Sequence, residues 1–192
     1  MKTKKLVAAA AVAATLCVTI GGTLAWLTDT TEKTTNTFTV GNVDIELTET
    51  TGSNYKMVPG NTIIKDPKVT VKAGSEACYV FVKVEESAGI NLKDYITYAI
   101  DTEDTDGEGS DEAYWTALPG VDGVYYKEVA SSQSDQVFPV LEKNQVVVKD
   151  TVTSAMMETA ETTAPTLAFT AYAIQSANMA DANAAWTALN VQ

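Results

Sequence analysis

The sequence contains no histidine among its 192 residues, and this absence removes several classes of enzyme. Zinc proteases of the HExxH kind need two histidines as metal ligands. Hydrolases that use a Ser-His or Cys-His pair need a histidine as the base. A metal site made only of carboxylates and a Ser-Lys pair are compatible with the residue count, but no motif points to either. The sequence therefore predicts a protein that is not an enzyme.

Arginine is also absent, and positive charge is scarce, because 13 lysines face 25 acidic residues. Without residues 1–25, ten lysines and all 25 acids remain, which gives a formal charge of −15. Such a surface repels nucleic acid and anionic lipid. We therefore expect no nucleic-acid partner, and we expect a soluble extracellular protein that attracts cations.

Cysteine occurs only twice, and Cys17 lies within the N-terminal apolar run. Only Cys78 remains after cleavage of that run, so no intramolecular disulfide can form and stability must come from the core. Cys78 alternates with three valines in a strand-like segment. We therefore expect a buried core thiol, with an intermolecular disulfide as the alternative.

The long apolar run at the N-terminus has the layout of a secretory signal. Three lysines within the first five residues precede fifteen mostly apolar residues, and Thr23 and Ala25 then supply small side chains before Trp26. This pattern predicts a helical signal peptide over residues 1–25, cleaved between Ala25 and Trp26. An uncleaved anchor over residues 6–25 is the alternative, since twenty apolar residues span a bilayer. The many alanines and a Gly-Gly pair favour the signal, so no stable membrane span is expected after cleavage.

A Thr-rich arm follows the cleavage region, with seven threonines among the twelve residues from Thr28 to Thr39. Threonine favours extended backbone, but the arm has almost nothing to bury. Residues 26–37 are therefore a candidate donor strand, one that pairs with the sheet of another copy, and a poorly ordered terminus is the alternative. The residues assigned to the arm are Trp26, Leu27, Thr28, Asp29, Thr30, Thr31, Thr34, Thr35 and Thr37.

Residues 38–192 are expected to form one domain of short strands. Alternating apolar residues predict strands over 38–47 (with a break at Gly41), 68–72, 77–86, 95–100, 114–115, 123–129, 146–148 (continuing toward 153) and 166–174. The strongest pattern, 77–86, is expected in the middle of a sheet. Asp181 predicts the start of a short C-terminal helix over 182–189. The absence of βαβ alternation favours an all-β antiparallel sandwich of jelly-roll or immunoglobulin-like type.

An acidic loop from Asp101 to Glu112 contains the calcium-like spacing Asp104-x-Asp106. The EF-hand motif fails, because threonine and alanine stand where its first Asp and last Glu belong. Calcium held irregularly by Asp101, Asp104 and Asp106 is an alternative to the default of a solvated loop. No other cofactor or metal is expected. The Leu118-Pro-Gly segment faintly resembles a sortase signal, but it lies mid-chain and is expected to form a turn.

Four segments resemble the TasA/camelysin family of exported bacterial matrix proteins. They are GGTLAWLTDT, NTFTVGNVDIEL, YKMVPGNTIIKDPKVTVKAGS and CYVFVKVEES, and AFTAYAIQSANM matches more loosely. The resemblance implies a signal processed by a dedicated SipW-type signal peptidase and a jelly-roll subunit of biofilm fibres. It also implies that the segment from Trp26 to about Thr37 completes the sheet of a neighbouring subunit.

The residues and the resemblance lead to one functional prediction. An arm without its own core suits pairing with the sheet edge of another copy, and head-to-tail lending that does not close gives filaments. We therefore expect a secreted fibre subunit of the extracellular matrix or cell surface, with copies of itself and other matrix proteins as partners. The alternatives are a monomeric surface adhesin or binding module and, more remotely, the metallopeptidase activity associated with the camelysin branch.

Overall fold

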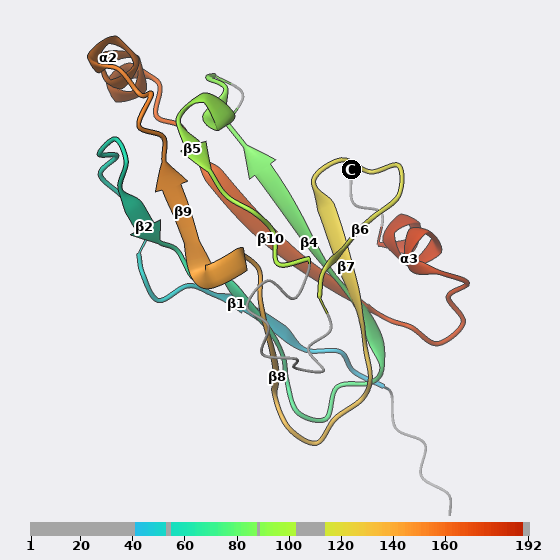
Figure 1. The fold of residues 1–192 in the computed structure, drawn as a ribbon. Coiled ribbons are helices and arrows are strands. Elements are labelled where there is room, and N and C mark those ends of the chain that lie inside the picture. The colour runs from blue at the N-terminus through green and yellow to red at the C-terminus, as the bar shows by residue number, and fades with distance from the viewer. Residues whose placement is uncertain (1–40, 53–54, 88, 103–113, 190–192) are drawn as a thin grey trace, which may run out of the picture. The chain divides into compact units, whose positions relative to one another are not determined.

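The computed structural model describes residues 41–52, 55–87, 89–102 and 114–189, and Figure 1 shows their arrangement. Within these ranges the chain forms mostly β-strands with two α-helices, so the prediction of an all-β protein is confirmed. The expectations for residues 1–40, which include the signal, the cleavage region and the arm, lie outside the described residues.

One layer is built on two bent strands that pair along their length. The first bent strand is β2 (Thr62–Ile64) followed by β3 (Lys68–Val71), and the second is β8 (Gln136–Pro139) followed by β9 (Gln145–Val148). β2 pairs with β9 and β3 with β8, both antiparallel. Backbone hydrogen bonds continue the pairing across the bends. The N–H of Val140 donates to the carbonyl of Pro67 at 2.9 Å, and the N–H of Lys65 donates to the carbonyl of Asn144 at 2.9 Å.

Two shorter strands complete this layer. β1 (Ile45–Thr48) pairs with β3, and β5 (Ile96–Thr97) pairs with β9. The bend between β8 and β9 is a single 3-10 turn, η2 (Glu142–Asn144), in which Lys143 and Asn144 have φ of 55° and 51°. These positive angles turn the backbone sharply, so β9 leaves in a new direction and pairs with β2 instead of β3.

The second layer is a four-stranded antiparallel sheet in the order β10-β4-β7-β6. Its strands are β10 (Leu167–Gln175), β4 (Cys78–Glu86), β7 (Val124–Val129) and β6 (Thr116–Ala117). β4 pairs with nine residues of β10 on one side and with six of β7 on the other. The prediction that this strand lies in the middle of a sheet is confirmed.

The main core lies between the two layers, where the inward faces of β3, β4 and β9 meet. Cys78, Val80 and Val82 of β4 are fully buried there against Val69 of β3 and Val148 of β9. The alternation of β4 is therefore confirmed, and it is buried on both faces. The opposite face carries Tyr79 and Phe81, which belong to a second cluster.

The short helix α3 (Ala182–Ala188) covers the second cluster. Asp181 caps it, accepting the backbone N–H of Ala184 at 2.8 Å, so the predicted C-terminal helix and its N-cap are confirmed. Trp186 packs on the outer face of the sheet, with ring centroids 5.1 Å from Phe81 and 5.5 Å from Tyr172. Figure 1 shows α3 beside this layer.

Several sequence expectations need correction. The strand expected over 95–100 is wrong: a 3-10 turn, η1 (Leu92–Asp94), precedes two paired residues, and Ile100 only bridges Leu141. Alternation in the sequence did not predict β2, β8 or the helix α2 (Ser154–Thr162). α2 buries only Ala160, so it has almost no apolar stripe for periodicity to detect. Its start does carry a signal, because Thr153 caps Met156 at 3.3 Å.

Candidate functional site: the open edge of β10

The residues predicted to carry function fall mostly outside the described ranges. Thr23, Ala25, Trp26 and the rest of the arm through Thr37 lie there, as do Asp104 and Asp106 of the acidic loop. Asp101 is described, and its backbone joins the loop to the β8–β9 bend, donating to Val140 at 3.0 Å. The calcium hypothesis therefore stays a prediction.

Backbone hydrogen bonds at the two ends of β10 show which of its residues bond to β4. Ser87 donates to the carbonyl of Thr166 at 3.0 Å, and Ser176 donates to that of Ala77 at 2.9 Å. Bonded and non-bonded pairs alternate in antiparallel sheets, so the even-numbered residues of β10 bond to β4. The backbone groups of the odd-numbered residues face away from β4, namely those of Leu167, Phe169, Ala171, Ala173 and Gln175.

No strand pairs with that side of β10 in the part of the chain that the structure describes. At nine residues β10 is as long as β4, and each of the other edge strands has four residues or fewer. A long unpaired edge is a template for strand addition, and folded proteins rarely leave one bare. β10 is therefore the strongest candidate acceptor among the described strands.

The side chains beside this edge are only half-buried although they belong to the main core. On β10 they are Leu167, Phe169, Ala171 and Ala173, and across the layers on or beside β1 they are Val43, Ile45 and Leu47. β1 and β10 contact one another across the two layers. Lys72 donates to the carbonyl of Asp44 at 2.9 Å, so the backbone groups of Ile45 and Leu47 also point away from their own sheet. We call this side of the two layers the β1–β10 seam.

A buried lysine closes one end of the β1–β10 seam. Lys65 is 8% exposed, and its Nζ lies 2.9 Å from both carboxylate oxygens of Glu49, which follows β1. The same ammonium lies 5.4 Å from the ring centre of Tyr55 and 5.6 Å from that of Phe169 in β10. These distances suit cation–π contacts, so Lys65 joins the two edge strands at this end.

Hydrogen bonds fix the loop after β1 around this lysine. Tyr55 donates its hydroxyl to Glu49 at 2.6 Å, and burial together with this bond raises the pKa of Tyr55. Asp66 accepts the hydroxyl of Thr50 at 2.7 Å and its backbone N–H at 2.9 Å. These two bonds hold the pKa of Asp66 well below its usual range. A cavity of about 480 Å³ lies next to Lys65, with apolar walls from β2, β5, β9 and α2.

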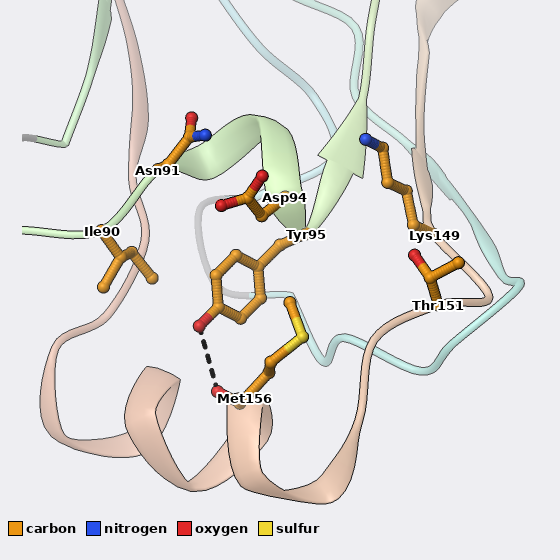
Figure 2. A pocket seen from close by; sticks show the side chains of 7 residues that line it. All are labelled: Ile90, Asn91, Asp94, Tyr95, Lys149, Thr151 and Met156. Atoms are coloured by element: carbon orange, nitrogen blue, oxygen red, sulfur yellow. Dashed lines mark hydrogen bonds between the residues drawn. The ribbon is translucent and has the colours of Figure 1, made fainter.

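Two further hollows meet at Lys149, just after β9. The first, of about 640 Å³, is drawn in Figure 2 and is lined by Ile90, Asn91, Asp94, Tyr95, Lys149, Thr151 and Met156. The hydroxyl of Tyr95 donates to the carbonyl of Met156 at 3.2 Å, which ties η1 to α2 (Figure 2). The second, of about 420 Å³, is lined by residues 96–100 with Lys93, Tyr125 and Lys149. The sequence analysis did not find these residues, because they come from separate segments with no common spacing.

Two minor expectations are confirmed. Cys78 has no exposed surface, and burial raises the pKa of its thiol to about 11, as expected of a core residue. The Leu118-Pro-Gly segment forms a turn, in which Val121 donates to the carbonyl of Leu118 at 3.2 Å. We therefore assign no chemical role to Cys78 or to the Leu118-Pro-Gly turn.

A comparison with protein families matches residues 2–94 to the family described as camelysin metallo-endopeptidase. No curated protein and no solved structure matches the chain significantly. The match ends in η1, so β10, α3 and Lys149 lie beyond it. Among the described residues, no three His, Cys, Asp or Glu side chains gather closely enough to hold a metal ion. None of the helices in the same ranges has the length and hydrophobicity to cross a membrane.

Proposed function

This chain belongs, through residues 2–94, to the camelysin metallo-endopeptidase family, and on that premise we propose that it is a secreted structural subunit of extracellular matrix fibres. A SipW-type signal peptidase removes residues 1–25. The mature N-terminal arm, residues 26–37, then pairs with the open edge of β10 in the next copy. The observation that carries this proposal is the long unpaired edge of β10 within the described chain.

The backbone of the β10 edge offers a matching set of hydrogen-bonding groups. Five residues of β10 direct an N–H and a carbonyl away from β4. An arm of twelve residues is long enough to pair with all nine residues of the strand. Each hydrogen bond contributes a net stabilisation of about 0.5–1.5 kcal/mol, so a fully paired arm is held by many individually weak hydrogen bonds. Its threonines are well suited to an extended strand.

The apolar side chains along the β1–β10 seam give the arm a second source of affinity. Phe169, Ala171 and Leu47 are half-buried in the isolated subunit, and a strand laid against β10 removes more of their surface from water. Apolar burial contributes about 25 cal/mol per Å². Because the arm and the edge lie on one chain, lending is head-to-tail and continues from copy to copy.

The order of the strands supports a jelly roll for the domain. β3 pairs with β8 in one layer, and β4 pairs with β7 in the other, so nested strand pairs alternate between the layers. This nesting is what a rolled-up pair of antiparallel strands produces. A jelly roll leaves strand edges at both sides of each layer, which supplies the acceptor that fibre growth requires.

We propose a structural role without catalysis, although the family's description names a metallo-endopeptidase. The sequence has no histidine, so it cannot form the His-containing ligand set of an HExxH protease. Function has to be argued from a site, and the described residues offer the edge of β10, the β1–β10 seam and the hollows at Lys149. The alternative of a monomeric surface adhesin uses the same domain and differs in its lack of polymers.

Electron microscopy of two purified chains tests the proposal. The chain that starts at Trp26 should form filaments at neutral or mildly acidic pH, and more readily with added salt, because its formal charge of −15 opposes association. The chain that starts at Phe38 should stay a folded monomer. Filaments from the shorter chain would show that the arm is not needed. A strictly monomeric longer chain that binds a glycan or a host protein would favour the adhesin.

A further inference from the structure

We propose that the two hollows that meet at Lys149 form one groove for a short segment of an acidic polysaccharide, one whose sugars carry carboxylates. The groove is formed by η1, β5, β7 and the segment from Lys149 to Met156. It is separate from the edge of β10, and the proposal does not depend on fibre formation.

Lys149 supplies the positive charge at the centre of the groove. Its side chain is half-buried, and no carboxylate lies within 4.0 Å of its ammonium in the described ranges. Other lysines are paired more tightly, as in Lys72 with Glu46 at 2.7 Å. A half-buried ammonium that has no counter-ion among the described residues is a fitting partner for a ligand carboxylate.

Lys93 adds a second cation in the hollow on the β5 side. Its side chain is 73% exposed and forms only a loose ion pair with Glu86, at 3.7 Å. Glu86 is engaged more closely by Tyr98, whose hydroxyl donates to it at 2.6 Å. Lys93 can therefore turn toward a ligand without breaking a strong contact. The ammonium groups of Lys93 and Lys149 therefore share this region with two carboxylates, those of Glu86, which already accepts a hydrogen bond, and Asp94.

Aromatic and polar side chains give the groove the character of a sugar site. Tyr98 and Tyr125 line the hollow on the β5 side, and rings that are apolar with a polar tip can pack on the C–H faces of a sugar. Asn91, Asp94 and Thr151 line the other hollow, shown in Figure 2. Amide and hydroxyl groups can donate to and accept from sugar hydroxyls, and a carboxylate accepts from them. The lining therefore combines stacking surfaces, hydroxyl partners and a central cation.

Hydrogen bonds between chain segments fix the floor of the groove. The backbone N–H of Lys149 donates to the carbonyl of Tyr95 at 2.8 Å, and that of Asp94 donates to Asn91 at 3.0 Å. With the Tyr95 hydroxyl bond to Met156, these contacts hold two of the four wall segments together, η1 and the segment from Lys149 to Met156. The hollows of about 640 and 420 Å³ share Lys149, so the ligand is extended instead of being a single small anion.

Calorimetric titration of the mature chain with oligogalacturonate tests the proposal, using its carboxyl-reduced form and oligoglutamate as comparison ligands. Lys149→Gln should weaken oligogalacturonate binding roughly tenfold or more, the scale of one charge-assisted hydrogen bond. Tyr125→Ala should weaken it as well. The matched control is Lys56→Gln, which removes an exposed lysine outside the groove that is likewise without an ion pair among the described residues, and it should have little effect.

Three results would overturn the proposal. Equal losses in Lys149→Gln and Lys56→Gln would show that only net charge matters. Equal binding of the carboxyl-reduced form would remove the carboxylate from recognition. Binding of oligoglutamate as tight as that of the sugar, or no binding of oligogalacturonate by the unaltered chain, would remove the sugar. An unchanged melting temperature in each variant ensures that a loss reports on the groove and not on folding.

Discussion

Replacing Ala171 with proline should block assembly while leaving the subunit folded. Ala171 lies in the middle of β10, and its N–H belongs to the set that faces away from β4. Proline removes that donor and places its ring at the edge, where a neighbouring strand would lie. Proline is tolerated on edge strands when its nitrogen faces solvent, so the hydrogen bonds to β4 are retained.

The size of the effect follows from the groups that are lost at the interface. One missing bond removes about 0.5–1.5 kcal/mol, and a carbonyl of the arm buried without a partner costs about 1–3 kcal/mol. The contact between copies should therefore weaken by about 2–4 kcal/mol. Each 1.4 kcal/mol is a factor of ten, so the concentration needed for assembly should rise roughly 30-fold to several hundred-fold.

Light scattering against protein concentration measures this threshold, and thermal melts of dilute samples report on the fold. Ala171→Ser is the matched control, because it alters the side chain and keeps the N–H; it should assemble near the original threshold. Thr170→Pro should instead destabilise the subunit, since Thr170 and Lys83 of β4 form one of the hydrogen-bonded pairs of the sheet. If folded Ala171→Pro assembles at the original concentration, the arm does not pair with this edge.

Three further predictions concern the described domain. The Cys78 thiol, whose pKa burial raises to about 11, should react with a thiol reagent at pH 8 only after denaturation; fast labelling of the native protein would contradict its place in the core. Hydrogen bonds from Thr50 lower the pKa of Asp66 when folded, so its carboxylate stabilises the fold above the ordinary value of about 3.9 and this contribution is lost as the pH falls below it. Asp66→Asn should be less stable at pH 7 and lose less stability on acidification in thermal melts, and parallel pH profiles would refute this. Trp186→Ala should lower the free energy of unfolding in urea by about 3–5 kcal/mol, and a loss below 1 kcal/mol would mean that α3 contributes little.

The elements that the sequence predicted well are those whose pattern is set by burial. β4 is apolar at every position from Cys78 to Val82 because both of its faces are covered there, by the other layer on one side and by α3 on the other. β10 likewise packs its odd-numbered apolar residues on the main core and Tyr172 and Ile174 on the second cluster, and α3 begins at an aspartate that caps it. In these segments the local residue pattern and the tertiary packing agree, so the pattern was sufficient to predict the element.

The parts that could not be predicted depend on contacts between distant segments. Alternation predicts β10 as a strand but does not predict which strands flank it. The open edge is visible only in the structure, where β4 pairs with one side of β10 and no described strand pairs with the other. β5 has only two paired residues, and Tyr95 at the start of the expected strand instead ends η1, where its N–H donates to the carbonyl of Leu92. The groove at Lys149 joins residues from η1, β5 and β7. Its central lysine is distinguished only by a spatial feature, since no carboxylate of the described residues lies within 4.0 Å of its ammonium.

A structure of the assembled fibre, determined by electron microscopy at a resolution that separates strands, tests the central claim most directly. The account predicts an additional strand beside β10 in every subunit, formed by residues 26–37 of the adjacent copy and hydrogen-bonded to the odd-numbered residues from Leu167 to Gln175. A fibre in which the edge of β10 is bare, or is covered by the arm of its own subunit, would contradict it.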